Sequence, residues 1–221
     1  MNKLIVLIIT LISSTFYSQK LRGISGGGIF LNPAFEKSIF VNLNTGFEYK
    51  VNNFIKPEIE FNYYFGSLPD ASIFNEAYIQ TSLLVRTTSA MGINFCPKIN
   101  LGDYEDIVFF QILPQFNINN VTAKGSLFTL SGNQTNLIKT DSDEYKEIHY
   151  SFGIGIGMLF ELNGDNSQSI ALNLVYNNIE IGNAINKLKF NGVIETRQSL
   201  GISLKYYFSL KIKNKKNNKI N

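Results

Sequence analysis

Residues 149–162 read "HYSFGIGIGMLFEL", and they alternate between two kinds of side chain. From Tyr150 to Leu162 every second residue is apolar, whereas the positions between are mostly glycine or polar. A period of two is typical of a β-strand with one apolar face. The alternation outlasts the roughly 5–6 residues of a usual soluble strand and reaches the roughly 9–11 residues that a tilted strand needs to cross a bilayer. The stretch therefore indicates a strand of membrane-spanning length.

The same period recurs along most of the 221-residue chain, and helical spacing is rare. Seven clear strands are predicted, together with a glycine-rich first strand of ambiguous faces: 22–31, 39–51, 55–65, 91–101, 108–119, 145–162, 169–177 and 199–210. The count is even, as in single-chain outer-membrane barrels. The sequence therefore predicts an all-β fold, an eight-stranded antiparallel up-and-down transmembrane β-barrel.

The predicted connections between strands differ in length in a regular order. Long connections follow the odd-numbered strands, at 31–38, 67–88, 120–145 and 179–195, and short ones follow the even-numbered strands, at 51–54, 102–106 and 163–166. Membrane barrels sort their connections in this way, with short periplasmic turns and longer outer loops. We therefore expect the chain to enter the barrel from the periplasmic side.

Both ends of the chain are expected to lie outside the barrel domain, 19–210. Residues 1–18 have a positive start and an apolar run too short for the roughly 20 residues of a membrane-spanning helix, which is typical of a signal peptide cleaved near Ser18. Residues 211–221 contain five lysines and are expected to form a solvated, disordered tail. No other apolar stretch has the length of a transmembrane helix, so any crossing of a membrane must use strands.

Charge and cysteine content exclude two further classes of protein. One of the 20 basic residues lies in the predicted signal peptide and five lie in the tail, which leaves 14 against 17 acidic residues in the barrel domain. A surface with this balance excludes nucleic acid as a partner. The single cysteine, Cys96, excludes an internal disulfide.

The period of two alone does not say whether the apolar faces of the strands point into the barrel or outward. A soluble secreted β-barrel that binds a small apolar ligand would bury its apolar faces, whereas a membrane barrel turns them to lipid. Strand length, aromatic residues near the strand ends and charges of both signs on the opposite faces favour the membrane barrel. These charges are Glu48, Lys50, Lys56, Glu58, Glu60, Lys98, Glu161 and Lys205.

An eight-stranded barrel has a lumen just wide enough for side chains to fill, so we expect the charges to pair there. The glycines at 153, 155 and 157 would leave room for long partners reaching across. Pro97 and Pro114 fall inside predicted strands, and we expect Pro114 to mark a bulge or bend.

Four stretches resemble strands and turns of small, porin-like outer-membrane β-barrel proteins of Bacteroidetes-type bacteria. They are the signal ending "YSQK" and the segments "IKPEIEFNYYFG", "NFCPKINLGD" and "FFQILPQFN". The resemblance covers the length of the barrel and implies a location in the outer membrane of a Gram-negative bacterium. It implies fold and location more than activity, because a fold does not determine function.

His149 is the only histidine, and with one cysteine neither a histidine cluster nor a thiolate site for metal is expected. The stretch "HYS" that it begins is similar to the H-x-S motif that some eight-stranded lipid A deacylases use with a glutamate. Glu161 would lie about 33 Å from Ser151 along the same strand, and Phe152 stands where that motif has an asparagine. Asp143 or Glu147 could take the place of the glutamate. We expect no catalytic, cofactor-binding or metal-binding residue, and no cofactor.

The leading interpretation is a non-enzymatic integral outer-membrane barrel that acts as a membrane anchor or binds through its outer loops. Its expected partners are outer-membrane lipid and an unknown ligand or protein at loops 67–88 and 120–145, parts of which could extend the hairpins above the membrane. The alternatives are an accessory barrel of a secretion or envelope machine, a small pore, the soluble barrel described above, and a lipid A-modifying hydrolase.

Overall fold

The structure is a computed structural model that describes residues 21–31, 39–102, 107–130, 136–163, 167–176, 179, 181–189 and 199–210. The predicted signal peptide, 1–18, and the predicted tail, 211–221, lie outside the described residues.

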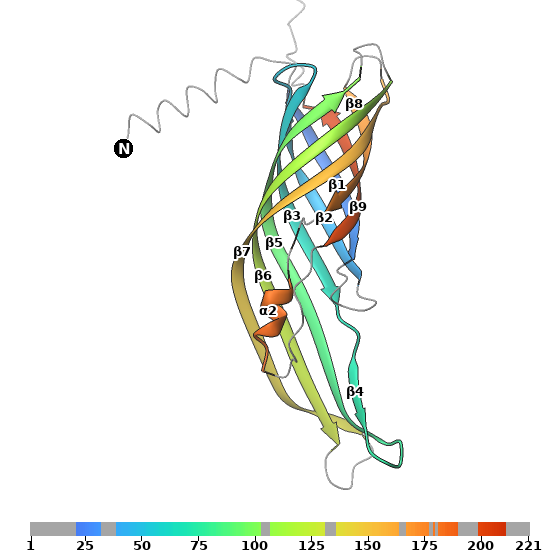
Figure 1. Cartoon of the computed structure of the whole chain (residues 1–221), viewed down its shortest axis with the longest axis vertical. Coiled ribbons are helices and arrows are strands. Elements are labelled where there is room, and N and C mark those ends of the chain that lie inside the picture. Colours follow the sequence, from blue (N-terminus) through green and yellow to red (C-terminus); the bar gives the residue numbers. More distant parts are fainter. Residues whose placement is uncertain are drawn as a thin grey trace, which may run out of the picture.

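Nine strands and one short helix make up the described chain. They are β1 (Leu21–Leu31), β2 (Ile39–Tyr49), β3 (Ile55–Ser67), β4 (Ala71–Phe74), β5 (Gln80–Leu101), β6 (Val108–Leu130), β7 (Leu137–Glu161), β8 (Gln168–Tyr176), α2 (Gly182–Asn186) and β9 (Leu200–Ser209). All eight predicted strands are confirmed, and β4 is an addition. The strands form one antiparallel sheet (Figure 1).

The sheet closes into a ring of eight strands. Its order is β3-β2-β1-β9-β8-β7-β6-β5-β4, and β3 also pairs with β5, which leaves β4 outside the ring. The first and last strands of the ring are joined from Arg22↔Ser209 to Leu31↔Leu200. Each of the eight strands therefore has a hydrogen-bonded neighbour on both sides, and the predicted up-and-down barrel is confirmed.

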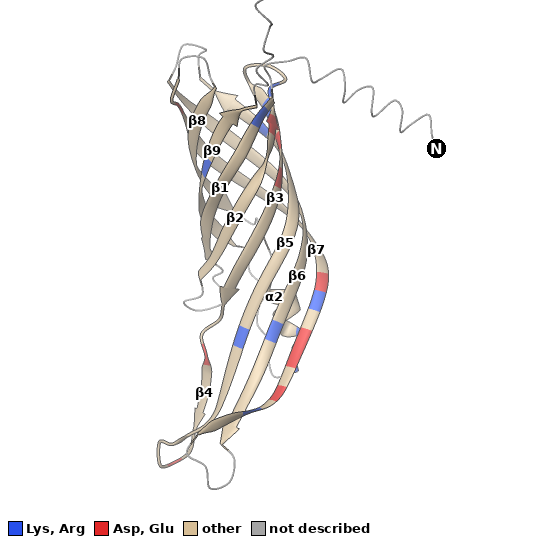
Figure 2. Ribbon diagram, turned by 180° about the vertical axis from the view of Figure 1, so that it is seen from behind, with Lys and Arg blue, Asp and Glu red and all other residues tan. Residues whose placement is uncertain are grey.

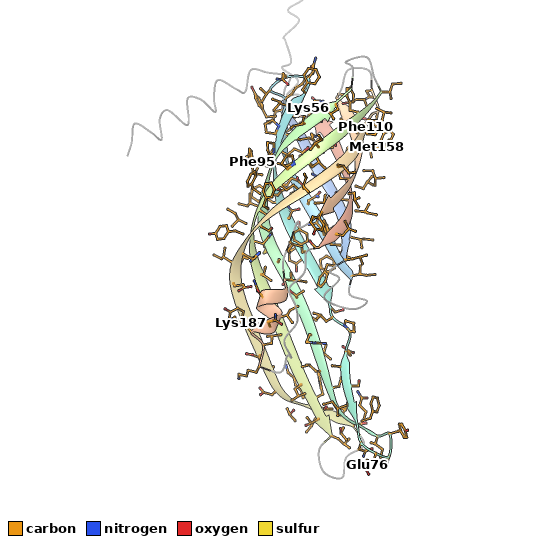
Figure 3. All side chains as sticks on the ribbon, in the orientation of Figure 1. Lys56, Glu76, Phe95, Phe110, Met158 and Lys187 are labelled. Atoms are coloured by element: carbon orange, nitrogen blue, oxygen red, sulfur yellow. The ribbon has the colours of Figure 1, made fainter. Side chains whose placement is uncertain are left out.

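The outer face of the ring is apolar. Ile156 on β7 and Phe116 on β6 are 61% and 51% exposed, and Figure 3 shows Phe95, Phe110 and Met158 pointing away from the barrel. A soluble barrel would bury such side chains, so the soluble alternative is wrong and the apolar face is the lipid-facing one.

The glycines of the opening stretch face the lumen. A Cβ atom on Gly157 would lie 2.0 Å from Oδ1 of Asn173, and one on Gly155 would lie 2.9 Å from the carbonyl oxygen of Leu174 and 3.3 Å from Leu113. The expected room for partner side chains is therefore present, and it is taken by residues of the neighbouring strands.

The apolar band on the outer face ends along one row of residues. On β5 and β7 the continuous run of exposed apolar side chains ends at Met91 and Ile148, which oppose Asn120 of β6 from either side; Ile138 is an isolated exposed side chain farther out. Beyond this row, exposed outward side chains include Lys124 and Glu144. From Met91 to the end of β5 the band covers about 11 residues, the length of a tilted membrane strand.

Three strands continue well beyond this row, as Figure 1 shows. We call this part the raised sheet: β4 together with residues 80–89 of β5, 120–130 of β6 and 137–147 of β7. Most of 67–88 and 120–145, expected as outer loops, is therefore paired strand. The alternation there places polar side chains on the outer face, so it lacks the lipid-facing signature that marks the other strands.

The prolines interrupt a ladder without shifting it. Between β5 and β6 the pairs stop at Phe95↔Phe116 and resume at Ile99↔Ile112 in the same register. The gap contains Pro97 and Pro114, which cannot donate ladder hydrogen bonds. The bulge expected at Pro114 is therefore a local opening of the ladder.

A charged side chain should be tolerated on the raised sheet but not in the apolar band of the outer face. Ile156→Arg places a cation in the lipid-facing wall and should destabilise the barrel by about 2–4 kcal/mol. Ser142→Arg, on the same strand but on the raised sheet, should change stability by less than about 0.5 kcal/mol. The measurement is a urea titration of protein refolded into lipid vesicles. The folded fraction is read from the gel heat shift, the difference in apparent mass between the unheated, folded barrel and the boiled chain. Equal costs would contradict the placement of the membrane.

Candidate functional site: a filled lumen below a raised sheet

One end of the lumen is filled by ion pairs centred on Glu58. It is the end with the short connections between strands, which in membrane barrels is the periplasmic end. The carboxylate of Glu58 contacts the ammonium groups of Lys98 and Lys205, the latter at 2.9 Å, and accepts a hydrogen bond of 2.8 Å from the hydroxyl of Tyr207. The side chains of Glu58 and Lys98 have no exposed surface. Three strands, β3, β5 and β9, are therefore joined through one carboxylate.

The network continues to either side. Lys205 also binds Glu60 at 2.7 Å, and Lys98 also binds Glu48, which pairs with Arg22 at 2.7 Å. The charged groups of this end balance, with four basic and four acidic residues: Arg22, Lys56, Lys98, Lys205, Glu48, Glu58, Glu60 and Glu161. A balanced set can stay ionised in a lumen where an unpaired charge would be costly.

Seven of the eight charges predicted for the lumen are confirmed there. Lys50 is the exception, because β2 ends at Tyr49 and Lys50 is only half-buried. Arg22 was missed, because the glycines at 26–28 hide the alternation of β1. A cation two positions before the inward Ile24 is the signal that could have found it.

A set of buried amide side chains lies among and beyond the ion pairs, from Asn100 and Gln111 near the short turns to Asn119 near the row of Met91. Asn94 donates a hydrogen bond of 3.1 Å to Glu60, and Asn42 donates one of 3.2 Å to Asn62. Its members are Asn42, Asn44, Asn62, Asn94, Asn100, Gln111, Gln115, Asn117, Asn119 and Asn173.

An apolar cluster closes the outer end of the lumen. It combines side chains of the wall with side chains of the connection between β8 and β9: Phe30, Phe40, Tyr64, Leu68, Ala90, Val121, Ala123, Val175, Ile179, Ile181, Ala184, Ile185 and Leu188. The expected long loop 179–195 is thus, in its described part, folded inward. Beside Phe40, Tyr64 and Ile181 a cavity of about 10 Å³ remains, which holds one water molecule at most.

The helix α2 is held by its surroundings more than by its own sequence. It has five residues and no side-chain cap, and it lies beside β6 and β7 in Figure 1. On either side of it, the N–H of Ile179 donates to Oγ of Ser199 at 3.2 Å and the N–H of Lys189 donates to Oδ2 of Asp143 at 2.9 Å. Gly125 leaves the space that Leu188 approaches. Apolar packing therefore keeps this segment over the mouth of the barrel.

The raised sheet carries charges of both signs on its outer face, and Figure 2 shows them as a run along β7. Glu144 binds Lys146 at 2.7 Å and Lys124 at 3.3 Å. Hydrogen bonds from these two ammonium groups lower the pKa of the Glu144 carboxyl below its usual value. The raised sheet is therefore a water-facing surface.

The residues considered for catalysis are far apart. Glu161 lies at the periplasmic end of β7, 3.6 Å from Arg22, whereas His149 and Ser151 lie near the middle of the same strand. Asp143 is engaged with the backbone of Lys189. In the part of the chain that the structure describes, no three histidine, cysteine, aspartate or glutamate side chains form a group that could hold a metal. The absence of catalytic and cofactor sites stays a prediction.

Comparisons with known proteins give structural similarity alone. Searches against protein-family models and curated proteins found no match. Among solved structures, Neisserial surface protein A has 11% identity over 87% of this chain and 97% of its own, with a TM-score of 0.47. A major outer membrane protein from Thermus thermophilus has 9% identity, covering 84% and 99%, with a TM-score of 0.47. The attachment invasion locus protein of Yersinia pestis has 12%, covering 86% and 99%, with a TM-score of 0.43.

The class of the protein follows from the geometry of the chain itself. Within the described ranges, no helix has the length and apolar character to cross a membrane. The ring is closed, its outer face is apolar, and its lumen holds charged and amide side chains. The protein is an integral β-barrel of the outer-membrane type, a kind found in the outer membrane of Gram-negative bacteria.

Removing the shared carboxylate should weaken the barrel strongly. Glu58→Ala leaves Lys98 and Lys205 buried with one fewer partner each, and we expect a loss of about 3–5 kcal/mol in the free energy of unfolding. The matched control is Glu144→Ala on the raised sheet, whose ion pairs are exposed and which should leave stability unchanged. Urea titration in lipid vesicles measures both. A tolerated Glu58→Ala would show that the network is incidental.

Proposed function

We propose that this protein is a non-enzymatic outer-membrane anchor whose barrel holds the raised sheet outside the cell, where it binds a partner. The observation that carries the proposal is the combination of a filled lumen with three strands that continue beyond the membrane. We also propose that it is one of the small barrels of Bacteroidetes-type bacteria, which the sequence stretches quoted above support.

The lumen supports anchoring over transport. Ion pairs, amides and a small apolar cluster fill the lumen beside the short turns, and a larger apolar cluster closes the outer end. Each of these three kinds of filling contains fully buried side chains, such as Lys98, Gln111 and Ile185. A small pore would need a continuous aqueous path through all three. The buried side chains that fill the lumen therefore disfavour the hypothesis of a pore.

The raised sheet supports binding. Its strands extend the wall of a rigid barrel, so side chains on it are presented in a set geometry. Its outer face carries the exposed side chains of Lys124 and Lys146, both paired with Glu144. A surface built this far from lipid has no role in spanning the membrane, which is complete at the row of Met91. Recognition outside the cell accounts for it.

Shortening the raised sheet should leave the barrel folded. In the test variant, Asn-Gly turns replace residues 69–85 and 126–142 and join Leu68 to Arg86 and Gly125 to Asp143, which face each other across their ladders. We expect the variant to reach the membrane, to keep its gel heat shift, and to show no stepwise conductance in planar bilayers, like the intact protein. A variant that no longer folds would show that the raised sheet is part of the barrel's own stability, and steady conductance of the intact protein would overturn the anchor.

A further inference from the structure

The hairpin of β4 and β5 ends in a cluster of exposed apolar side chains, which we call the apolar tip: Ile73, Phe74, Tyr78 and Ile79. They are 64%, 56%, 89% and 53% exposed. From the row of Met91 to the start of β5 the strand runs roughly 35 Å, so the tip is well clear of the protein's own lipid band. Figure 3 shows Glu76, inside the turn, at the end of the raised sheet farthest from the barrel.

The turn of the apolar tip is ordered by Asn75. Its Oδ1 accepts hydrogen bonds from the N–H groups of Ala77 and Ile79, at 3.0 and 2.9 Å. Its own N–H donates to the carbonyl of Ile79, and the N–H of Tyr78 donates to the carbonyl of Asn75, both at 3.0 Å. Most of the turn's backbone donors are thus satisfied within the turn. A turn in that state loses few hydrogen bonds to water when it enters the interfacial layer of a bilayer.

Tyr78 is held in a strained conformation. Its φ is 58°, in the left-handed region that non-glycine residues seldom occupy. A glycine would fit this turn without strain. The chain instead carries a large aromatic side chain there and exposes most of it. A strained residue with an exposed aromatic ring is a feature that contact with a partner would explain.

The polar side chains around the tip are already used inside the hairpin. Gln80 donates a hydrogen bond of 2.9 Å to Ser72, and Thr81 donates one of 3.1 Å to the carbonyl of Ile73. All four residues of β4 are exposed, so both faces of the hairpin are uncovered. Residues 68–85 contain no basic residue and two acidic ones, Asp70 and Glu76.

We propose that the apolar tip inserts into the interfacial layer of a second bilayer outside the cell, one with electrically neutral headgroups. A protein interface surrounds an apolar centre with a polar rim that forms hydrogen bonds, whereas this tip is apolar on both sides and offers few free polar groups. Tyrosine and phenylalanine are residues that favour the membrane interface. Glu76 and Asp70 disfavour an anionic surface. This inference rests on the proposed function, because it names the partner of the raised sheet.

Insertion of one tip would be shallow and weak. Glu76 carries a charge at the apex, which restricts the tip to the headgroup and upper acyl region, where charged side chains keep access to water. Many barrels in one outer membrane would present many tips to the same surface. Their combined attachment can exceed that of a single tip by orders of magnitude. Binding should therefore be tested with many copies of the protein in the same vesicle membrane.

The test uses the full-length protein reconstituted at high density in vesicles, mixed with larger probe vesicles of phosphatidylcholine. Binding is read as co-flotation of the two vesicle populations. We expect Phe74→Ser with Tyr78→Gly to reduce co-flotation by about tenfold or more. Glu76→Gln should increase it. Probe vesicles containing anionic phosphatidylglycerol should bind less well than neutral ones.

The choice of Tyr78→Gly keeps the test interpretable, because glycine relieves the strained φ and so preserves the turn. Ile138→Ser, which removes an exposed apolar side chain from the neighbouring hairpin, is the matched control and should leave co-flotation unchanged. The gel heat shift reports that each variant is folded. Absent co-flotation by the folded, intact protein, or equal co-flotation by the tip variant, would overturn the inference and point to a protein partner. The anchor role would stand in that case, because it is tested by the shortened variant.

Discussion

No backbone hydrogen-bonding group can be left unpaired in the hydrocarbon layer of a membrane, and the architecture of this protein depends on that constraint. Pairing of β1 with β9 and of β3 with β5 removes both edges that an open sheet would expose. Closure in turn creates a narrow interior whose contents must be self-sufficient. Beyond the lipid band the constraint no longer applies, and there the chain uses an open, raised sheet with β4 at its edge.

The interior shows how a small barrel can be filled without a soluble-type core. Ionised groups, amides and a small apolar cluster fill one end, and a larger apolar cluster fills the other. The end with the larger apolar cluster is covered by the connection between β8 and β9, so a loop of the barrel itself closes the lumen there. The outer surface, in contrast, is determined almost entirely by lipid. Alternate residues of the same strands therefore serve two different environments: one set packs in the lumen, and the other faces lipid.

The strands and the direction of their faces could be predicted, because alternation over membrane length is a strong signal. Lumenal charges such as Glu58 and Lys205 followed from the same pattern. Three features could not be predicted, each for a physical reason. The glycines of β1 hide the alternation of polar and apolar residues that would have located Arg22 in the lumen. The raised sheet alternates without an apolar outer face, so it resembles a loop. The helix α2 is too short for a period, and only tertiary packing holds it.

The ion pairs around Glu58 connect strands that are distant in the chain. Glu58 lies on β3, whereas Lys205 and Tyr207 lie on β9, the final strand. During synthesis and insertion the acidic groups of β3 therefore precede their last partners by nearly the whole barrel. A sheet that lacks β9 has both an open edge and an incomplete set of charges. We therefore expect assembly in the membrane to be cooperative, because the arrival of β9 completes the backbone ladder and the electrical balance together.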